Sequence, residues 1–281
     1  MLASGGRTQV VRIAYIDLFA FSTDPRFAPR VVRSGAAGVV VDWERRGKRR
    51  RQAGADTQVN ADTPADLANV RAATPGRVLC RVNGWGRWTP GEIDLAASLG
   101  ADEVLLPMVR RAEEVDAALE VVAGRCGLGI LVETADAVDA VGELLCRPLS
   151  RVYLGLNDLM IDRRSRCLFA ALIDGTADAV GAAAAAAGIA FGVAGLTRPD
   201  AGHPVPCRLL IGELARLGAA FTFLRRSFHA DTSGRPLAVE VPRILGAAAA
   251  ASRRGAEEVA TDRADLEGLV GRLNGDEAEA V

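Results

Sequence analysis

The sequence predicts an α/β protein that folds as a single (β/α)8 barrel of the TIM type, with an extra helical segment at the C-terminus. The chain has 281 residues, a length typical of one such barrel. Short apolar runs alternate with amphipathic helical segments, the pattern of a parallel sheet covered by helices. Eight β-α pairs can be counted and each strand is apolar throughout, which favours a closed barrel over an open doubly wound sheet.

The predicted strands are short runs rich in valine, isoleucine and leucine, the residues that pack on a sheet buried on both faces. They span residues 10–16, 37–42, 77–83, 103–107, 127–133, 151–155, 190–195 and 220–224.

The predicted helices fill the intervals, at residues 25–34, 64–73, 90–99, 112–123, 135–145, 170–187, 206–217 and 236–251. Pro64 and Pro90 lie near helix starts, where the missing N–H costs nothing, and glycines such as Gly100 and Gly188 lie where helices should end. We therefore expect a barrel over residues 1–251, followed by a solvated C-terminal helical arm or tail over residues 252–281.

Composition limits which kinds of binding partner and which cellular compartment are expected for the protein. The formal net charge is −1, so no overall field favours nucleic acid or an anionic membrane. The basic run from Lys48 to Arg51 is read as a solvated loop or as a rim that attracts a small anion, since no aromatic residues interleave it. Five scattered cysteines without C-x-x-C spacing, and a polar N-terminus without the apolar stretch of a signal peptide, predict reduced thiols in a cytoplasmic protein.

Polar residues that end apolar runs are the first candidates for chemistry, because a barrel places its active site at the C-terminal ends of its strands. Such residues follow the second, third, fifth and sixth predicted strands. They are Asp42 and Glu44, Arg81 and Asn83, Glu133, and Asn157 with Asp158.

Glu133 and Asp158 end neighbouring strands, so their oxygens can converge. Two converging carboxylates with open coordination positions suit Mg²⁺ or Mn²⁺; the alternative is a salt bridge or a helix cap for each acid. Arg81 interrupts an apolar strand and needs an anionic partner. A substrate carboxylate or enolate oxygen would match its planar fork, and Asp42 or Glu44 is the structural alternative.

Loops after the last two strands supply further candidates. His203 and His229 follow these strands and either is a candidate proton carrier, although an exposed loop histidine is the simpler interpretation. Gly195 and Thr197 suggest a place where a carboxylate approaches backbone N–H groups. We therefore treat Arg81, Asp42, Glu44 and His229 as catalytic candidates, Arg81, Asn83, Asn157, Gly195 and Thr197 as substrate contacts, and Glu133 and Asp158 as metal ligands.

Between about residues 35 and 228 the sequence resembles the citrate lyase β-subunit and metal-dependent (class II) pyruvate aldolase superfamily, relatives of the phosphoenolpyruvate/pyruvate barrels. Five short motifs in order carry the resemblance. They are Val-Val-Asp-Trp-Glu-Arg at 40–45 with Lys48 and Arg51 following, Arg-Val-Asn at 81–83, Glu-Val-Leu-Leu-Pro-Met-Val at 103–109, Ile-Leu-Val-Glu-Thr-Ala at 130–135 and Leu-Gly-Leu-Asn-Asp-Leu at 154–159.

The resemblance implies that Glu133 and Asp158 bind Mg²⁺, that the ion chelates the carboxylate and keto oxygen of a 2-oxo acid, and that Arg81 stabilises the enolate. It also implies a homo-oligomer, trimeric or hexameric, with the C-terminal helix reaching a neighbouring subunit. Two departures stand out. Arg45 occupies the place of a histidine that assists proton transfer in the aldolase branch, and Met108 occupies the place of a frequent lysine.

The leading functional hypothesis is a lyase or aldolase that acts through a metal-bound enolate of pyruvate, oxaloacetate or a related 2-oxo acid. Acyl-coenzyme A lyase chemistry of the citryl or malyl type, thioesterase chemistry and a phosphoenolpyruvate-type transfer are alternatives within the fold, although the C-terminal part lacks the motif of the thioester lyases. A barrel that binds a small acid or a partner protein without turnover is the alternative from a different class.

Overall fold

Eight parallel strands close into a barrel in the computed structural model, which describes residues 16–47 and 62–279. Each strand pairs with the next in sequence, and β8 pairs with β1. The predicted (β/α)8 fold is therefore confirmed. The strands are β1 (Asp17–Phe21), β2 (Gly38–Asp42), β3 (Arg77–Arg81), β4 (Glu103–Leu106), β5 (Gly127–Val132), β6 (Arg151–Leu154), β7 (Ala190–Leu196) and β8 (Phe221–Leu224).

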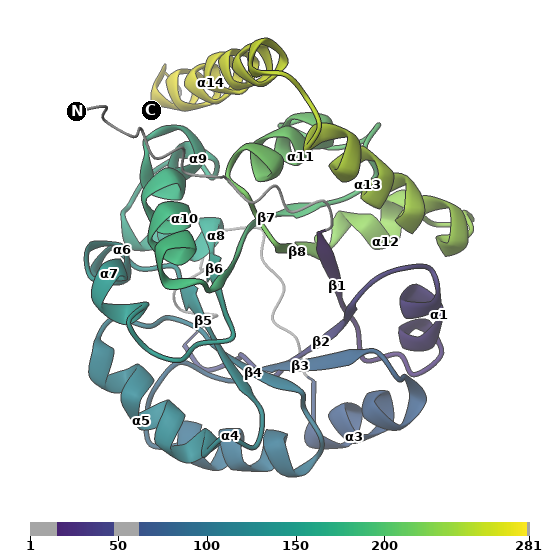
Figure 1. The fold of residues 1–281 in the computed structure, drawn as a ribbon, viewed down its shortest axis with the longest axis vertical. Helices are drawn as coiled ribbons and strands as arrows, with labels where there is room; N and C mark the ends of the chain where they lie inside the picture. The colour runs from purple at the N-terminus through teal and green to yellow at the C-terminus, as the bar shows by residue number, and fades with distance from the viewer. Residues whose placement is uncertain (1–15, 48–61, 280–281) are drawn as a thin grey trace, which may run out of the picture.

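Helices surround the barrel, and α14 lies outside this ring beside α9 and α11 (Figure 1). None of the helices in residues 16–47 and 62–279 is long and apolar enough to cross a membrane. The helices are α1 (Phe27–Arg33), α3 (Pro64–Ala73), α4 (Thr89–Ser98), α5 (Ala112–Val122), α6 (Ala135–Asp139), α7 (Val141–Leu144), α8 (Leu156–Asp162), α9 (Ala170–Ile173), α10 (Thr176–Ala187), α11 (Cys207–Arg216), α12 (Ser227–Asp231), α13 (Leu237–Ala251) and α14 (Ala256–Glu279).

The first strand is the main correction to the predicted elements. It was expected at residues 10–16, but β1 begins at Asp17; of the expected range only Ile16 is described, and it precedes the strand. Two predicted helices are each divided in two. Residues 135–145 form α6 and α7, and residues 170–187 form α9 and α10, which Gly175 separates with a φ of +90°. The short helices α8 and α12 were not predicted.

Alternate residues of each strand face two different cores. One set packs between the strands and the surrounding helices, and the other fills the barrel interior. The interior set consists of Phe19, Val40, Leu79, Leu105, Leu131, Phe221 and Phe223. Because strand side chains alternate, the residues two positions further along, such as Phe21, Asp42, Arg81 and Glu133, belong to the same face and lie closer to the C-terminal mouth.

A buried ion pair fills the opposite, N-terminal end of the interior. Arg151 of β6 donates from Nε to both carboxylate oxygens of Glu103 on β4, at 2.6 and 2.7 Å. The guanidinium carbon also lies 4.7 Å from the ring centre of Phe19 and 4.5 Å from that of Phe221. Gly129 of β5 lies between the two partners, and a Cβ there would be 2.7 Å from Arg151 Cγ. The pair therefore depends on a glycine in the intervening strand.

The C-terminal segment is a helix that packs on its own barrel. Leu266 and Val270 of α14 are buried, and Arg263 donates from Nη1 to the Leu172 carbonyl and to Glu213 Oε1, both at 2.6 Å. The segment predicted as a solvated arm thus has an apolar stripe and a polar anchor. Contact between this segment and a neighbouring subunit stays a prediction.

Two further sequence-based interpretations concern the basic run and the cysteines. The basic run from Lys48 to Arg51 lies outside the described residues. All five cysteines, by contrast, are described, and all are free.

Candidate active site

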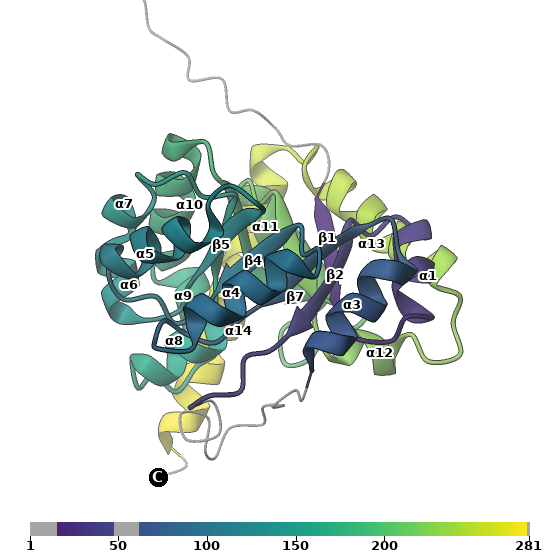
Figure 2. The same ribbon diagram turned by 90° about the horizontal axis from the view of Figure 1, so that it is seen from below.

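The candidate site residues come from strand ends at one mouth of the barrel. Asp42 and Arg81 are the last residues of β2 and β3, and Glu133 directly follows β5. Asp158 lies in the first turn of α8, which begins two residues after β6. Figure 2 shows α8 and α12, which follow β6 and β8, at the same lower end of the barrel. This is the C-terminal face, where barrels of this kind carry their active sites.

Arg81 is held by two carboxylates from the neighbouring strand and its loop. Its Nε and Nη2 donate to the two carboxylate oxygens of Asp42, at 2.8 and 2.7 Å, and its Nη1 lies 3.4 Å from Glu44 Oε2. Asp42 and Glu44 are each 1% exposed. Burial alone would lower the pKa of Arg81, but the two acids raise it well above its ordinary value. The guanidinium is therefore a fixed positive charge in a fixed plane.

Glu133 is a buried acid in an unusual environment. Burial, and then the charges of Asp158 and Glu44, raise the pKa of its carboxyl to about 8, although Arg81 and a hydrogen bond from Met108 act in the opposite direction. That hydrogen bond runs from the Met108 N–H to Glu133 Oε1 at 2.9 Å. Met108 has a φ of +56°, a costly conformation for a residue with a Cβ, and this conformation directs its N–H into the site.

Glu133 and Asp158 follow the neighbouring strands β5 and β6. Asp158 is 7% exposed, and its charge raises the pKa of Glu133. In the described part of the chain, no group of three or more His, Cys, Asp or Glu side chains is arranged to hold a metal ion. Metal binding by Glu133 and Asp158 stays a prediction; two carboxylates are the kind of donors that an ion such as Mg²⁺ accepts while it keeps several water or substrate ligands.

Gly155 leaves the space that the Glu133 carboxylate occupies. A Cβ at position 155 would lie 2.4 Å from Glu133 Oε2 and 2.8 Å from its Cβ, which is too close for any side chain. We expect Gly155→Ala to displace the carboxylate and to weaken Mn²⁺ binding, measured by titration calorimetry, about 10-fold or more. Gly142→Ala in α7 is the matched control, since no atom lies within 4 Å of its added Cβ; equal affinity in the two variants would contradict this role of Gly155.

Asn83 organises the loop after β2. Its Oδ1 accepts the backbone N–H groups of Arg45 and Arg46, at 3.0 and 2.7 Å. Its Nδ2 donates to the Trp43 carbonyl at 3.1 Å and to Glu92 Oε1 at 2.8 Å. These contacts use both acceptor sites and both donors of the amide. Asn83 thus positions the segment that carries Glu44, and its assignment as a substrate contact stays a prediction.

The candidates from the last strands lie at a different part of the rim. Thr197 donates a short hydrogen bond from Oγ1 to Asp231 of α12, and Gly195 lies against Arg225, whose Cβ would be 2.8 Å from an added Cβ. His229 is exposed, and its Nε2 lies 3.2 Å from the Phe21 carbonyl. The structure therefore places these three residues with β1, β7, β8 and α12, and the carboxylates with β2, β5 and β6.

Asn157 is half-buried in the first turn of α8, next to Asp158. The end of this helix is fixed to its neighbours by Asp162, which accepts hydrogen bonds from Arg110 Nη2 at 2.5 Å and from the Ala135 N–H at 2.8 Å. Ala135 begins α6, two residues after Glu133. Arg110 and Asp162 thus tie the segments that carry the two predicted metal ligands.

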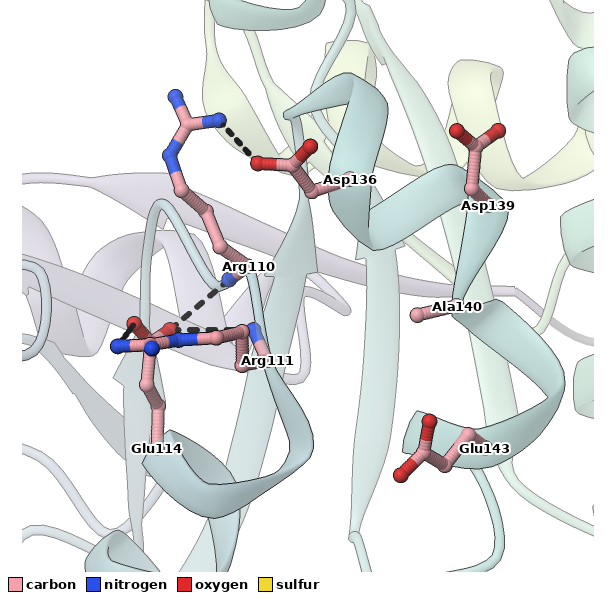
Figure 3. A pocket seen from close by; sticks show the side chains of 7 residues that line it. All are labelled: Arg110, Arg111, Glu114, Asp136, Asp139, Ala140 and Glu143. Atoms are coloured by element: carbon pink, nitrogen blue, oxygen red, sulfur yellow. Dashed lines mark hydrogen bonds and ion pairs between the residues drawn. The ribbon is translucent and has the colours of Figure 1, made fainter.

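Arg110 also lines an open surface pocket of about 730 Å³ beside α5, α6 and α7. Figure 3 shows its side chain directed toward Asp136, and Asp139 and Glu143 on separate helical turns. Arg110 Nη1 donates to Asp136 Oδ2 at 2.7 Å. The pocket contains none of the predicted site residues, so it is separate from the carboxylate cluster.

Met108 and Gly155 were missed by sequence reasoning as parts of the site. Met108 contributes a backbone N–H because its φ is positive. Only glycine commonly signals a positive φ, so a methionine at this position gave no indication of that conformation. Gly155 had a weak signal, because a glycine at the end of an apolar strand often marks the close approach of another group.

Comparison with known proteins identifies the family of the chain. The family model for "HpcH/HpaI aldolase/citrate lyase" matches residues 16–199. No curated protein sequence is significantly similar to the chain.

Three solved structures illustrate the shared fold. An HpcH/HpaI aldolase from Desulfitobacterium hafniense has 15% identity and a TM-score of 0.60, with 79% of this chain and 90% of that one covered. RipC from Yersinia pestis has 16% identity and a TM-score of 0.57, with 88% and 99% covered. Citrate synthase SbnG has 16% identity and a TM-score of 0.58, with 79% and 91% covered. At these identities the likeness shows the fold alone, whereas the family model covers more than half of the sequence. The chain belongs to the HpcH/HpaI aldolase/citrate lyase family.

Proposed function

We propose that this protein is a divalent-metal-dependent carbon–carbon lyase or aldolase that acts on 2-oxo acids related to pyruvate or oxaloacetate through an enolate. The observation that carries the proposal is the charge balance at the barrel mouth. Within the described residues, the buried carboxylates of Asp42, Glu44, Glu133 and Asp158 gather with one guanidinium, that of Arg81. Such a surplus of buried negative charge favours a bound cation.

Glu133 and Asp158 are the residues that would hold Mg²⁺ or Mn²⁺. Asp42 and Glu44 are engaged with Arg81, whereas Glu133 Oε2 lies in the space that Gly155 leaves. A cation beside Glu133 would relieve the repulsion from Asp158 and Glu44 that raises its pKa. Bound there, the ion supplies Lewis acidity to the oxygens of a 2-oxo acid.

Arg81 is the residue that would stabilise the negative charge of the enolate. Its plane is fixed by the two hydrogen bonds to Asp42, and its side chain keeps 14% of its surface exposed at the barrel mouth. A guanidinium held in place before the reaction does not have to reorganise when charge develops on the substrate. Asp42 and Glu44 are accordingly positioning residues for Arg81.

The apolar interior below these charges would exclude water from the reacting carbon. Phe21 lies under the Arg81 guanidinium, with 5.2 Å between the guanidinium carbon and the ring centre, and Phe223 lies 5.2 Å from Phe21, centre to centre. A low-polarity wall strengthens each electrostatic contact with the substrate and protects an enolate from unwanted protonation.

The test is release of pyruvate or oxaloacetate from a panel of 4-hydroxy-2-oxo acids and acyl-coenzyme A esters, with Mg²⁺ or Mn²⁺ and again with EDTA. We expect metal-dependent release from at least one 4-hydroxy-2-oxo acid. Release from the thioesters alone would identify the acyl-coenzyme A branch. Metal binding without turnover on any member of the panel would favour a barrel that binds a small acid without catalysis.

We further propose that the protein is a homo-oligomer, a trimer or hexamer. The proposal rests on its resemblance to the citrate lyase and aldolase superfamily. Light scattering of the full chain would test it, and a monomeric mass would contradict it.

A further inference from the structure

Tyr153 projects into the barrel interior next to the candidate site. Its neighbours in β6, Val152 and Leu154, belong to the core between strands and helices, so Tyr153 faces the opposite way and packs against the interior cluster. It pairs in register with Leu131 of β5. Glu133 lies two residues beyond Leu131, on the same face, so the Glu133 carboxylate lies one layer above the level of Tyr153.

Aromatic contacts connect Tyr153 to the guanidinium of Arg81. The ring centres of Tyr153 and Phe223 are 4.5 Å apart, Phe223 lies 5.2 Å from Phe21, and Phe21 lies beneath Arg81 at 5.2 Å. Arg81, Phe21, Phe223, Tyr153 and Glu133 therefore line the interior from five strands or strand ends. The charges of Arg81 and Glu133 both act on the Tyr153 phenol, as expected for groups that share one lumen.

The phenol of Tyr153 is polar, half-buried and uncommitted in this apolar lining. Within residues 16–47 and 62–279 its oxygen makes no hydrogen bond, and the side chain keeps accessible surface although it faces the interior. A buried tyrosine hydroxyl normally finds a partner. The Tyr153 ring packs against the interior cluster, and the charges of Arg81 and Glu133 act on its hydroxyl.

We propose that Tyr153 is a further catalytic residue, whose phenol O–H donates a hydrogen bond to an oxygen of the bound 2-oxo acid as negative charge develops on it. This inference rests on the proposed lyase function. Arg81 and Tyr153 come from β3 and β6, so they reach the substrate from different walls of the barrel. Burial raises the pKa of the Tyr153 phenol above its ordinary value, so the group keeps its proton and acts only as a donor.

A hydrogen bond to an oxygen that carries negative charge is stronger than one to a neutral oxygen. The Tyr153 O–H should therefore stabilise the enolate more than the ground-state 2-oxo acid. Oxalate, a planar dianion with two adjacent oxygens, imitates the enolate, and pyruvate represents the ground state. Tyr153→Phe removes only the hydroxyl and retains the contacts with Phe223. We expect this variant to bind oxalate about 10-fold more weakly in the presence of Mg²⁺, to bind pyruvate with nearly unchanged affinity, and to lose kcat about 100-fold.

Titration calorimetry of wild type, Tyr153→Phe and Thr222→Val would decide the matter. Thr222 also loses a buried hydroxyl, but that hydroxyl binds the Val193 carbonyl at 3.0 Å and lies on the other face of β8, so its loss should leave the ratio of oxalate to pyruvate affinity unchanged. Equal oxalate affinity and equal kcat in wild type and Tyr153→Phe would overturn the role of Tyr153 and leave the lyase function standing. A wild-type protein that binds neither ligand with Mg²⁺ and cleaves no substrate would overturn both.

Discussion

Glu133→Gln should lower metal-dependent turnover about 100- to 1,000-fold while it makes the metal-free protein more stable at pH 8. The two effects have one cause. The carboxylate charge that would bind the cation is costly to bury, since Asp158 and Glu44 lie nearby. Glutamine keeps the shape of the side chain and an oxygen for the Met108 N–H, but it cannot supply the charge. Mn²⁺ affinity, turnover and thermal midpoint would be measured on the same samples.

The pH dependence of stability separates this explanation from a general packing effect. The pKa of Glu133 is raised from an ordinary 4.5 to about 8 on folding, so the folded state holds this proton more tightly than the unfolded state. The stabilisation is complete below the ordinary pKa and is lost as pH rises toward 8. The thermal midpoint of metal-free Glu133→Gln should therefore exceed that of wild type by about 4 °C or more at pH 8, and by less at pH 5.

Asp139→Asn is the matched control, because Asp139 is an exposed carboxylate on the helix that follows Glu133. It should change neither turnover nor the pH dependence of stability. Full metal-dependent turnover in Glu133→Gln would exclude Glu133 as a ligand. A midpoint difference that is the same at pH 5 and pH 8 would contradict the raised pKa.

Arg81→Met should reduce both stability and turnover, because it leaves Asp42 and Glu44 as buried carboxylates without their guanidinium. Removal of one partner from a buried ion pair costs about 3–5 kcal/mol, which corresponds to a fall in thermal midpoint of roughly 5–8 °C for a chain of this size. Arg81→Lys keeps the charge but cannot reproduce the planar pair of bonds to Asp42, so we expect kcat/KM to fall about 100-fold or more with a smaller loss of stability.

A double substitution distinguishes the lost pair from other damage. Arg81→Met with Asp42→Asn removes one of the stranded charges and should regain part of the lost stability, whereas turnover should stay low. Arg125→Lys is a control for arginine replacement, since the Arg125–Asp94 pair lies on the surface and should contribute little. Wild-type turnover in Arg81→Lys would restrict Arg81 to a structural role.

The sequence predicted the barrel well because apolar strands and helix-ending glycines are local signals. Strands β2 to β8 begin within one residue of the predicted positions. The first strand was misplaced because residues 10–16 are rich in valine and isoleucine, whereas β1 contains Asp17 at its start and alanine and aromatic residues after it. The helices α8 and α12 are too short to show a period of 3.6 residues, so their sequences carried no helical signal.

The candidate site could be predicted where it depends on strand order and not where it depends on exact backbone geometry. Glu133 and Asp158 follow adjacent strands, so their approach followed from topology. The sequence left open whether Arg81 pairs with a substrate or with nearby acids, because the answer depends on side-chain positions. In the structure Arg81 pairs with Asp42 and Glu44. The functions of Met108 and Gly155 depend on one φ angle and on one interatomic distance, which no pattern of residue types encodes.

The Glu103–Arg151 pair at the N-terminal end of the barrel has a consequence for how this sequence can evolve. The two side chains come from β4 and β6 and meet over Gly129 of the intervening strand β5. Loss of Glu103 removes the carboxylate that pairs with Arg151, and loss of Arg151 leaves Glu103 with the Ser150 hydroxyl in place of a guanidinium. A larger residue at 129 pushes the partners apart, so each single step is disfavoured. A fully apolar trio would nevertheless pack about as well as the ion pair. Related sequences should therefore keep all three residues or replace all three, with few intermediates.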